Sequence, residues 1–130
     1  MKRYLIPFFV STIKAGFPSP ADDFLENRLN LNELLIEHPE ATFFVQVSGD
    51  SMINAGIHSG DKLIVDRSLQ ARNGDVIVAV IDNEFTVKRL KKVANKIYLI
   101  PENPNYHPIY IRPGSDFIIW GVVKHVIHSF

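Results

Sequence analysis

Residues 75–90 read DVIVAVIDNEFTVKRL, and their pattern indicates the fold class of this 130-residue chain. The run 76–81 contains no polar side chain, which is typical of a strand that is covered on both faces and is central in its sheet. Asp82 and Asn83 follow, and both residue types tolerate the positive φ of a two-residue turn. Residues 84–90 then resume an extended pattern. The stretch therefore predicts an antiparallel hairpin.

Further short apolar runs flank this hairpin and are separated by turn residues, a pattern typical of all-β barrels and sandwiches. With the hairpin included, strands are predicted at 42–47, 62–65, 75–81, 84–90, 96–100, 109–111 and 117–127. A chain of 130 residues with 46% hydrophobic side chains is long enough for one compact domain and too short for two. We expect a mostly β core over 42–130.

The residues before this core have a different character. Asn30 is a suitable N-cap for a short helix over 31–36, which His38-Pro39 would end. Residues 16–23 read GFPSPADD, and their prolines favour an extended, exposed linker. We therefore expect a linker and a short helix over 16–41.

The leading segment MKRYLIPFFVSTI looks superficially like a signal peptide. Pro7 interrupts its apolar run, however, and the run falls short of the roughly 20 residues that span a bilayer. Two interpretations stay open for the segment: a strand or arm that packs on a partner surface, or a flexible leader.

Composition excludes several kinds of chemistry. Fourteen Lys and Arg balance fourteen Asp and Glu, so we expect no direct binding of nucleic acid by the bulk surface. The chain has no cysteine, which removes disulfides, thiolate nucleophiles and Cys-ligated metals and suits a reducing compartment.

The five histidines of the chain show no metal-ligand spacing, and on one strand His125 and His128 would face opposite ways. No phosphate-binding glycine motif occurs. We therefore expect no metal and no cofactor.

One segment has unusual local chemistry. Ser51 follows Gly49-Asp50 where a strand meets a turn, so its hydroxyl could lie exposed on a tight bend with the backbone amides of Asp50 and Ser51 directed at an oxyanion. Gly-Asp-Ser is equally a common turn tripeptide, and this interpretation stays open. No histidine has a recognisable triad context.

A lysine can act as the base in place of histidine if burial lowers its pKa enough to keep it neutral. Lys88 lies within the apolar strand 84–90 and shares a face with Thr86 and Leu90 by the period of two. The alternative is a charged residue on a half-exposed strand. Lys91 and Lys92, at the end of the strand, are expected to be solvated.

The chain resembles the UmuD-type mutagenesis proteins, which are self-processing serine peptidases related to the LexA-type repressors. The segments that carry the resemblance are GFPSPADD at 16–23, LNELLI at 31–36, SGDSMI at 48–53, GD at 60–61, LIVD at 63–66, EFTVK at 84–88 and GVV at 121–123. They cover nearly everything after residue 15, in order. Ser51 and Lys88 are 37 residues apart, which agrees with the family's spacing. The first 15 residues match the family poorly.

The resemblance implies a β-barrel or sandwich core like that of LexA and signal peptidases, with a short helix and an extended N-terminal arm. It implies Ser51 as nucleophile, Lys88 as general base and self-cleavage between Ala15 and Gly16, so that residues 1–15 are a removable arm. Backbone amides at Asp50 and Ser51 would hold the oxyanion.

The resemblance also implies a role in the cytoplasm. Cleavage would be triggered by RecA filaments on single-stranded DNA, as part of the SOS response to DNA damage. The processed homodimer would then serve a Y-family, UmuC-type polymerase in translesion synthesis. We expect no membrane association.

Two rival functions compete with this one. The first is a non-catalytic β-domain that regulates a DNA polymerase by protein–protein binding, with an unused Ser–Lys pair. The second is a membrane-associated signal peptidase, which shares the chemistry but needs an anchor that the arm is too short to supply.

Overall fold

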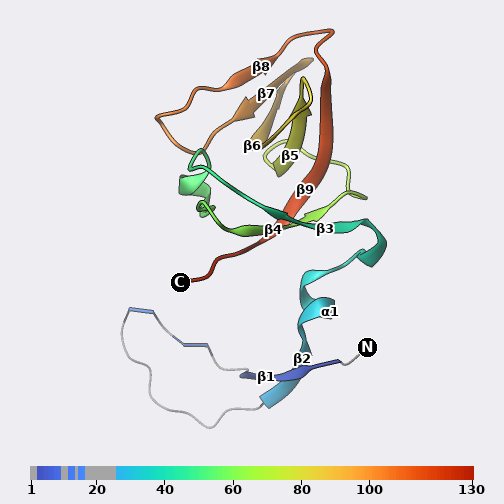
Figure 1. Cartoon of the computed structure of the whole chain (residues 1–130), viewed down its shortest axis with the longest axis vertical. Coiled ribbons are helices and arrows are strands. Elements are labelled where there is room, and N and C mark those ends of the chain that lie inside the picture. The colour runs from blue at the N-terminus through green and yellow to red at the C-terminus, as the bar shows by residue number, and fades with distance from the viewer. Residues whose placement is uncertain (1–2, 10–11, 14, 17–25) are drawn as a thin grey trace. The chain divides into compact units, whose positions relative to one another are not determined.

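The computed structural model describes residues 3–9, 12–13, 15–16 and 26–130 (Figure 1). The chain divides into two compact units, residues 1–37 and residues 38–130. The predicted linker 16–23 lies outside the described residues except for Gly16, which is in an exposed bend.

The first unit contains a two-stranded antiparallel ribbon and a short helix. Strand β1 (Leu5–Phe9) pairs with β2 (Glu26–Asn30), and α1 (Leu31–Leu35) follows directly. The predicted helix and its cap are confirmed, because the Asn32 backbone N–H donates to the Asn30 side chain at 3.0 Å. The sequence analysis did not predict β2. Pro7 lies within β1, which a two-stranded ribbon tolerates because each of its strands has one unpaired edge.

The second unit is built on a seven-stranded antiparallel sheet in the order β3-β4-β9-β5-β6-β7-β8. Its strands are β3 (Thr42–Gln46), β4 (Lys62–Asp66), β5 (Val76–Ile81), β6 (Glu84–Val93), β7 (Lys96–Ile100), β8 (Ile109–Ile111) and β9 (Phe117–Ile127). Two 3₁₀ turns, η1 (Pro39–Ala41) and η2 (Ile53–Ala55), precede β3 and β4. The order is open, with β3 and β8 at its two ends, so the sheet is not a closed barrel.

All seven predicted strands are present, and the mostly β prediction is confirmed. The main difference in extent is β6, which continues three residues past Leu90. Asp82 and Asn83 have φ of 49° and 67°, as the predicted hairpin turn requires. Strand β5 has three strands on either side of it, so its predicted central position is also confirmed.

Two hydrophobic cores lie on opposite faces of β5. Ile77 and Ala79 belong to one core, with Leu90 and Leu99 from β6 and β7. Val78 belongs to the other, which contains Met52, Ile57, Leu63 and Val65. Alternate residues of a strand point to opposite faces, so the unbroken apolar sequence of β5 reflects burial on both sides.

Strand β9 connects the two parts of the sheet, because it pairs with β5 and with β4 (Figure 1). Both pairings change register partway along, between Ile64 and Val65 on β4 and between Val78 and Ala79 on β5. Gly121 lies on β9 in this region, and a Cβ at this position would be 2.5 Å from Val65 Cγ1. A glycine therefore permits the close approach of β9 to β4.

Candidate active site

Ser51 is held in a tight turn between β3 and η2. Gly49 precedes it with φ of +97°, a conformation that disfavours any residue with a Cβ. Met52 follows it and is only 2% exposed, packed in the core that contains Leu63 and Val78. A turn that requires glycine on one side and a buried Met52 on the other therefore position the half-buried Ser51.

Lys88 lies on β6 with only 8% of its surface exposed. Its Nζ is 3.0 Å from Ser51 Oγ, 2.7 Å from Thr86 Oγ1 and 3.1 Å from the Val87 carbonyl oxygen. Burial lowers the pKa of Lys88 below the ordinary value of 10.5. Lys91 and Lys92 are exposed, as expected. The structure thus brings together the serine and the lysine that the sequence singled out.

The segment between β7 and β8 contacts the turn around Ser51. The backbone N–H of Glu102 donates to the Ser51 carbonyl at 2.8 Å. The side chain of Asn103, itself 8% exposed, donates to the Asp50 carbonyl at 2.9 Å, and the Tyr106 hydroxyl donates to Asp50 Oδ1 at 2.6 Å. This last hydrogen bond raises the pKa of Tyr106. Sequence reasoning missed this support, because no spacing motif connects residues some fifty positions apart.

The backbone amides of Asp50 and Ser51 were predicted to hold an oxyanion. Among the described residues, neither N–H donates a hydrogen bond to a protein acceptor. Asp50 is exposed and Ser51 is half-buried, so a bound carbonyl oxygen could approach this turn from solvent.

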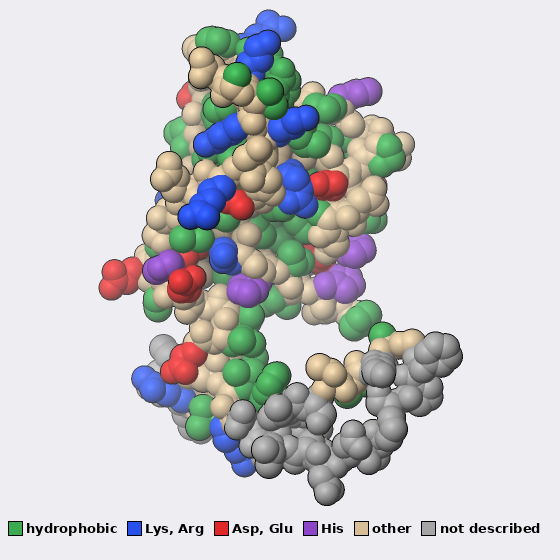
Figure 2. Space-filling model, turned by 180° about the vertical axis from the view of Figure 1, so that it is seen from behind, with side chains coloured by type: hydrophobic (Ala, Val, Ile, Leu, Met, Phe, Trp, Pro, Cys, Tyr) green, Lys and Arg blue, Asp and Glu red, His purple; other side chains and the backbone are tan. Residues whose placement is uncertain are grey.

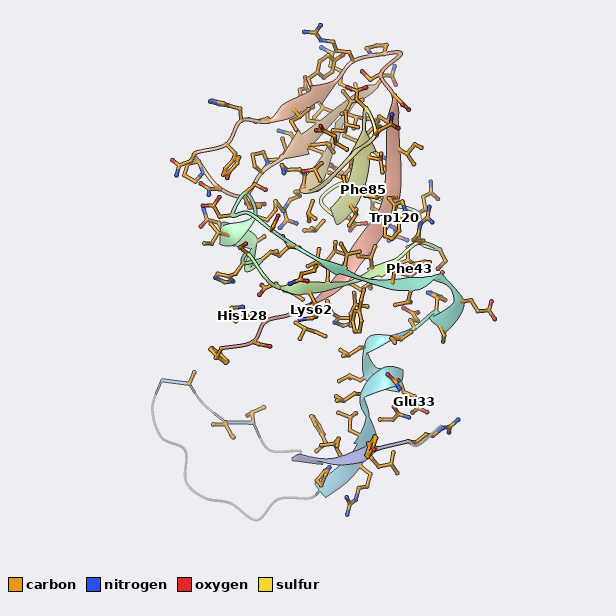
Figure 3. All side chains as sticks on the ribbon, viewed as in Figure 1. Glu33, Phe43, Lys62, Phe85, Trp120 and His128 are labelled. Carbon is orange, nitrogen blue, oxygen red and sulfur yellow. The ribbon has the colours of Figure 1, made fainter. Side chains whose placement is uncertain are left out.

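A cleft of about 280 Å³ lies in front of the pair. Ser51, Lys88, Val45, Phe85 and Tyr106 are among the residues that line it. Phe85 is 65% exposed, and its ring meets Trp120 edge-on at 5.9 Å. Trp120 in turn contacts Phe43 at 5.4 Å, and Figure 3 shows these three aromatic side chains along one side of the unit. Phe85 thus adds an apolar side chain to the lining of the cleft, whereas Trp120 and Phe43 are not among its lining residues.

The predicted cleavage site lies in the first unit. Ala15 and Gly16 form an exposed bend, while Lys14 and residues 17–25 lie outside the described residues.

The predicted strand 117–127 coincides with β9, so His125 lies on the strand and His128 follows its end. Strand β9 ends where Ile127 pairs with Lys62, the first residue of β4. His128 instead lies beside His58 and Asp61, a grouping that their positions in the sequence do not suggest.

The sequence matches the family model described as Peptidase S24-like over residues 7–124. Together with the β-rich fold, this match places the chain in a class of serine peptidases. The chain belongs to the Peptidase S24-like family.

Relatives of the chain support the same assignment. Protein MucA of Salmonella typhimurium is 50% identical over 121 residues, which cover 92% of this chain and 82% of that protein. Protein ImpA of Shigella flexneri is 44% identical over 126 residues, which cover 96% of this chain and 85% of that protein. LexA repressor 1 of Geobacter sulfurreducens is 43% identical over 112 residues, covering 85% of this chain and 55% of the repressor. The resemblance to UmuD-type and LexA-type proteins is confirmed.

Among the residues that the structure describes, no helix is long and apolar enough to cross a membrane.

Proposed function

We propose that the protein is a self-cleaving serine peptidase in which Ser51 is the nucleophile, Lys88 is the general base and the Ala15–Gly16 bond is the target. The observation that carries this proposal is the 3.0 Å distance between Lys88 Nζ and Ser51 Oγ, at a lysine that is only 8% exposed. A nucleophile and base within hydrogen-bonding distance are the minimum that covalent catalysis needs.

Lys88 Nζ has three acceptors in the structure, Ser51 Oγ, Thr86 Oγ1 and the Val87 carbonyl oxygen, which match the three N–H groups of an ammonium. When Lys88 loses a proton, its two remaining N–H groups can keep the bonds to Thr86 and Val87. The lone pair is then directed at Ser51, whose hydroxyl can donate to it. Burial disfavours the ammonium form, so the neutral amine is reached at a lower pH than in water.

The reaction proceeds in two stages. Lys88 takes the hydroxyl proton as Ser51 Oγ attacks the carbonyl carbon of Ala15, and the backbone amides of Asp50 and Ser51 stabilise the oxyanion. The C–N bond breaks, Lys88 gives the proton to the leaving Gly16 amine, and Ala15 remains esterified to Ser51. Water, deprotonated by Lys88, then attacks the ester carbonyl; the bond between Ser51 Oγ and the Ala15 carbonyl carbon breaks, and Lys88 returns the proton to Ser51 Oγ. The products are residues 1–15 with a new carboxylate and a chain that begins at Gly16.

The similarity to UmuD-type proteins supports the proposed biological setting. Cleavage would occur in the cytoplasm when the chain meets RecA filaments on single-stranded DNA during the SOS response. The processed homodimer would act as an accessory subunit of a Y-family polymerase of the UmuC type in translesion synthesis. A peptidase that carries its own substrate must stay in an inactive conformation until cleavage is needed. The trigger then shifts the population toward the active conformation.

The proposal is tested by intact-mass measurement on the purified full chain at alkaline pH. We expect loss of the first 15 residues, and loss of this cleavage in Ser51→Ala and in Lys88→Ala. Ser48→Ala, in the same cleft, and Lys91→Ala, exposed on the same strand, are matched controls that should still cleave. RecA filaments should accelerate the reaction at neutral pH. An unchanged mass with filaments present would favour the rival β-domain that only binds a polymerase.

A further inference from the structure

Three side chains that are far apart in the sequence converge at the surface of the second unit. His58 and Asp61 lie in the turn before β4, and His128 follows the end of β9. One potential ligand atom from each lies within 4.8 Å of the other two. Figure 3 shows His128 beside Lys62, the residue next to Asp61, and Figure 2 shows exposed histidine side chains in contact on one face of this unit. None of the three lines the cleft at Ser51.

Asp61 is the centre of this cluster. Its side chain is 2% exposed, whereas those of His58 and His128 are 47% and 41% exposed. The backbone N–H of His58 donates to Asp61 Oδ2 at 2.8 Å, and this bond, with the two imidazoles, lowers the pKa of Asp61. A buried carboxylate is therefore held ionised beneath two imidazole rings that face solvent. Buried charges in proteins are paired or coordinate metals.

The ligand set matches the chemistry of zinc. Two imidazole nitrogens and one carboxylate oxygen form a common three-ligand set, with a fourth position left for water. Imidazole also binds copper and nickel, whereas magnesium and calcium prefer oxygen alone. The hydrogen bond from the His58 backbone N–H to Asp61 Oδ2 is of the kind that holds a metal-binding carboxylate in its orientation.

The distances are close to those of a coordinated site. Metal–ligand bonds of roughly 2.05 Å in a tetrahedron separate the ligand atoms by about 3.3 Å. His128 Nδ1 is 2.6 Å from Asp61 Oδ1, and His58 Nδ1 is 3.7 Å from Asp61 Oδ2. The two imidazoles therefore contact different oxygens of Asp61, and the three ligand atoms, which lie within 4.8 Å of one another, must come closer together for one cation to bind all of them. Both imidazole rings are partly exposed, and their ring contacts are with each other at 4.8 Å and, for His128, with the exposed Phe130 at 5.5 Å, so no buried side chain has to move for this adjustment.

We propose that His58, Asp61 and His128 bind one transition-metal cation of the Zn²⁺ type, with water completing the coordination. The cation joins the end of β9 to the turn that precedes β4. That turn is hydrogen-bonded to Val47, since Gly60 N–H donates to the Val47 carbonyl at 2.7 Å and Val47 N–H donates to the Asp61 carbonyl at 2.9 Å. The site therefore stabilises the segment that leads from β3 into the Ser51 turn.

The test uses the full chain, purified without a polyhistidine tag and stripped of metal with a chelator. Calorimetric titration with ZnCl₂ should give one site per chain with a dissociation constant in the micromolar range. His58→Ala and His128→Ala should each weaken binding tenfold or more. His107→Ala is the matched control, because His107 is exposed and lies outside the cluster, and its affinity should be unchanged.

A second measurement does not depend on the folding of any variant. Titration of the unmodified chain with CoCl₂ should produce the visible absorption of tetrahedral Co²⁺ with imidazole and carboxylate ligands, and ZnCl₂ should displace it. The proposal is overturned if the unmodified chain binds neither cation below millimolar concentration. The proposal is also overturned if zinc affinity is unchanged in His58→Ala and in His128→Ala, or if His107→Ala weakens it as much as they do. The cluster would then consist only of imidazole–carboxylate pairs.

Discussion

Gly121→Ala should destabilise the second unit, because β9 passes too close to β4 for a methyl group. The added Cβ would be 2.5 Å from Val65 Cγ1, 3.3 Å from Arg67 Cγ and 3.4 Å from the Asp66 carbonyl oxygen. Carbon atoms pack at about 3.5–4.0 Å, so the first contact must open by at least about 1 Å. Val65 is fully buried and β-branched, so it has no alternative rotamer with free space.

The size of the effect follows from two opposed contributions. Overpacking a core costs about 1–3 kcal/mol, whereas replacing glycine by alanine restricts the unfolded chain and recovers about 0.4–1 kcal/mol. The net loss of unfolding free energy should therefore be about 1–2 kcal/mol. Trp120 is the only tryptophan of the chain and precedes Gly121, so its fluorescence during urea unfolding reports directly on this strand.

A double-mutant cycle identifies the cause. Val65→Ala removes the clashing methyl and should cost about 2 kcal/mol by itself. The double variant should lose about 1 kcal/mol less unfolding free energy than the sum of the two single variants, because the methyl group that Gly121→Ala adds then occupies the space that the Val65 methyl has left. Gly114→Ala is the control for coupling: its φ of +86° makes an alanine costly there, but its Cβ would meet nothing within 4 Å, so its loss should add to that of Val65→Ala. Additive losses at Gly121, or no loss at all, would refute the steric explanation.

Three further predictions concern the site. Burial lowers the pKa of Lys88 in the folded chain below 10.5, so between the folded and unfolded pKa values the unfolded chain binds more protons. The unfolding free energy of the native chain, relative to that of Lys88→Met, should therefore rise with pH up to about 10.5. A difference that stays constant with pH in urea melts would contradict this. Tyr106→Phe removes a hydrogen bond to Asp50 and should slow self-cleavage roughly 2- to 10-fold with little change in stability, measured by intact mass and circular dichroism. Asn103→Ala removes one of the two hydrogen bonds to the Asp50 carbonyl, which still accepts from the Ile53 backbone N–H at 3.2 Å, and should cost about 0.5–1.5 kcal/mol in urea melts as well as slowing cleavage. Equal activity would argue against its positioning role.

The strands of the second unit could be predicted because they are short and their sequence signals are local. The apolar run of β5 indicates burial on both faces, and Asp82-Asn83 indicates a turn because both residue types tolerate a positive φ. Strand β2 could not be found in this way. It depends on pairing with β1 across a segment of 16 residues, and Pro7 obscured the strand pattern of its partner.

The candidate site was predictable only in part, for the same physical reason. Ser51 and Lys88 have local signals, a glycine turn and a lysine in an apolar strand, and the family resemblance added their pairing. Asn103 and Tyr106 support Ser51 through contacts that only the folded chain brings together. The cluster of His58, Asp61 and His128 likewise depends on the end of β9 lying beside the turn before β4.

Activation of Ser51 by a neutral Lys88 is tested by the rate of self-cleavage as a function of pH. The rate of appearance of the chain that begins at Gly16 should rise as Lys88 loses its proton and then level off, with Trp120 fluorescence confirming that the fold is intact at each pH. A rate that is independent of pH from neutral to strongly alkaline conditions, in a folded chain, would contradict lysine as the base.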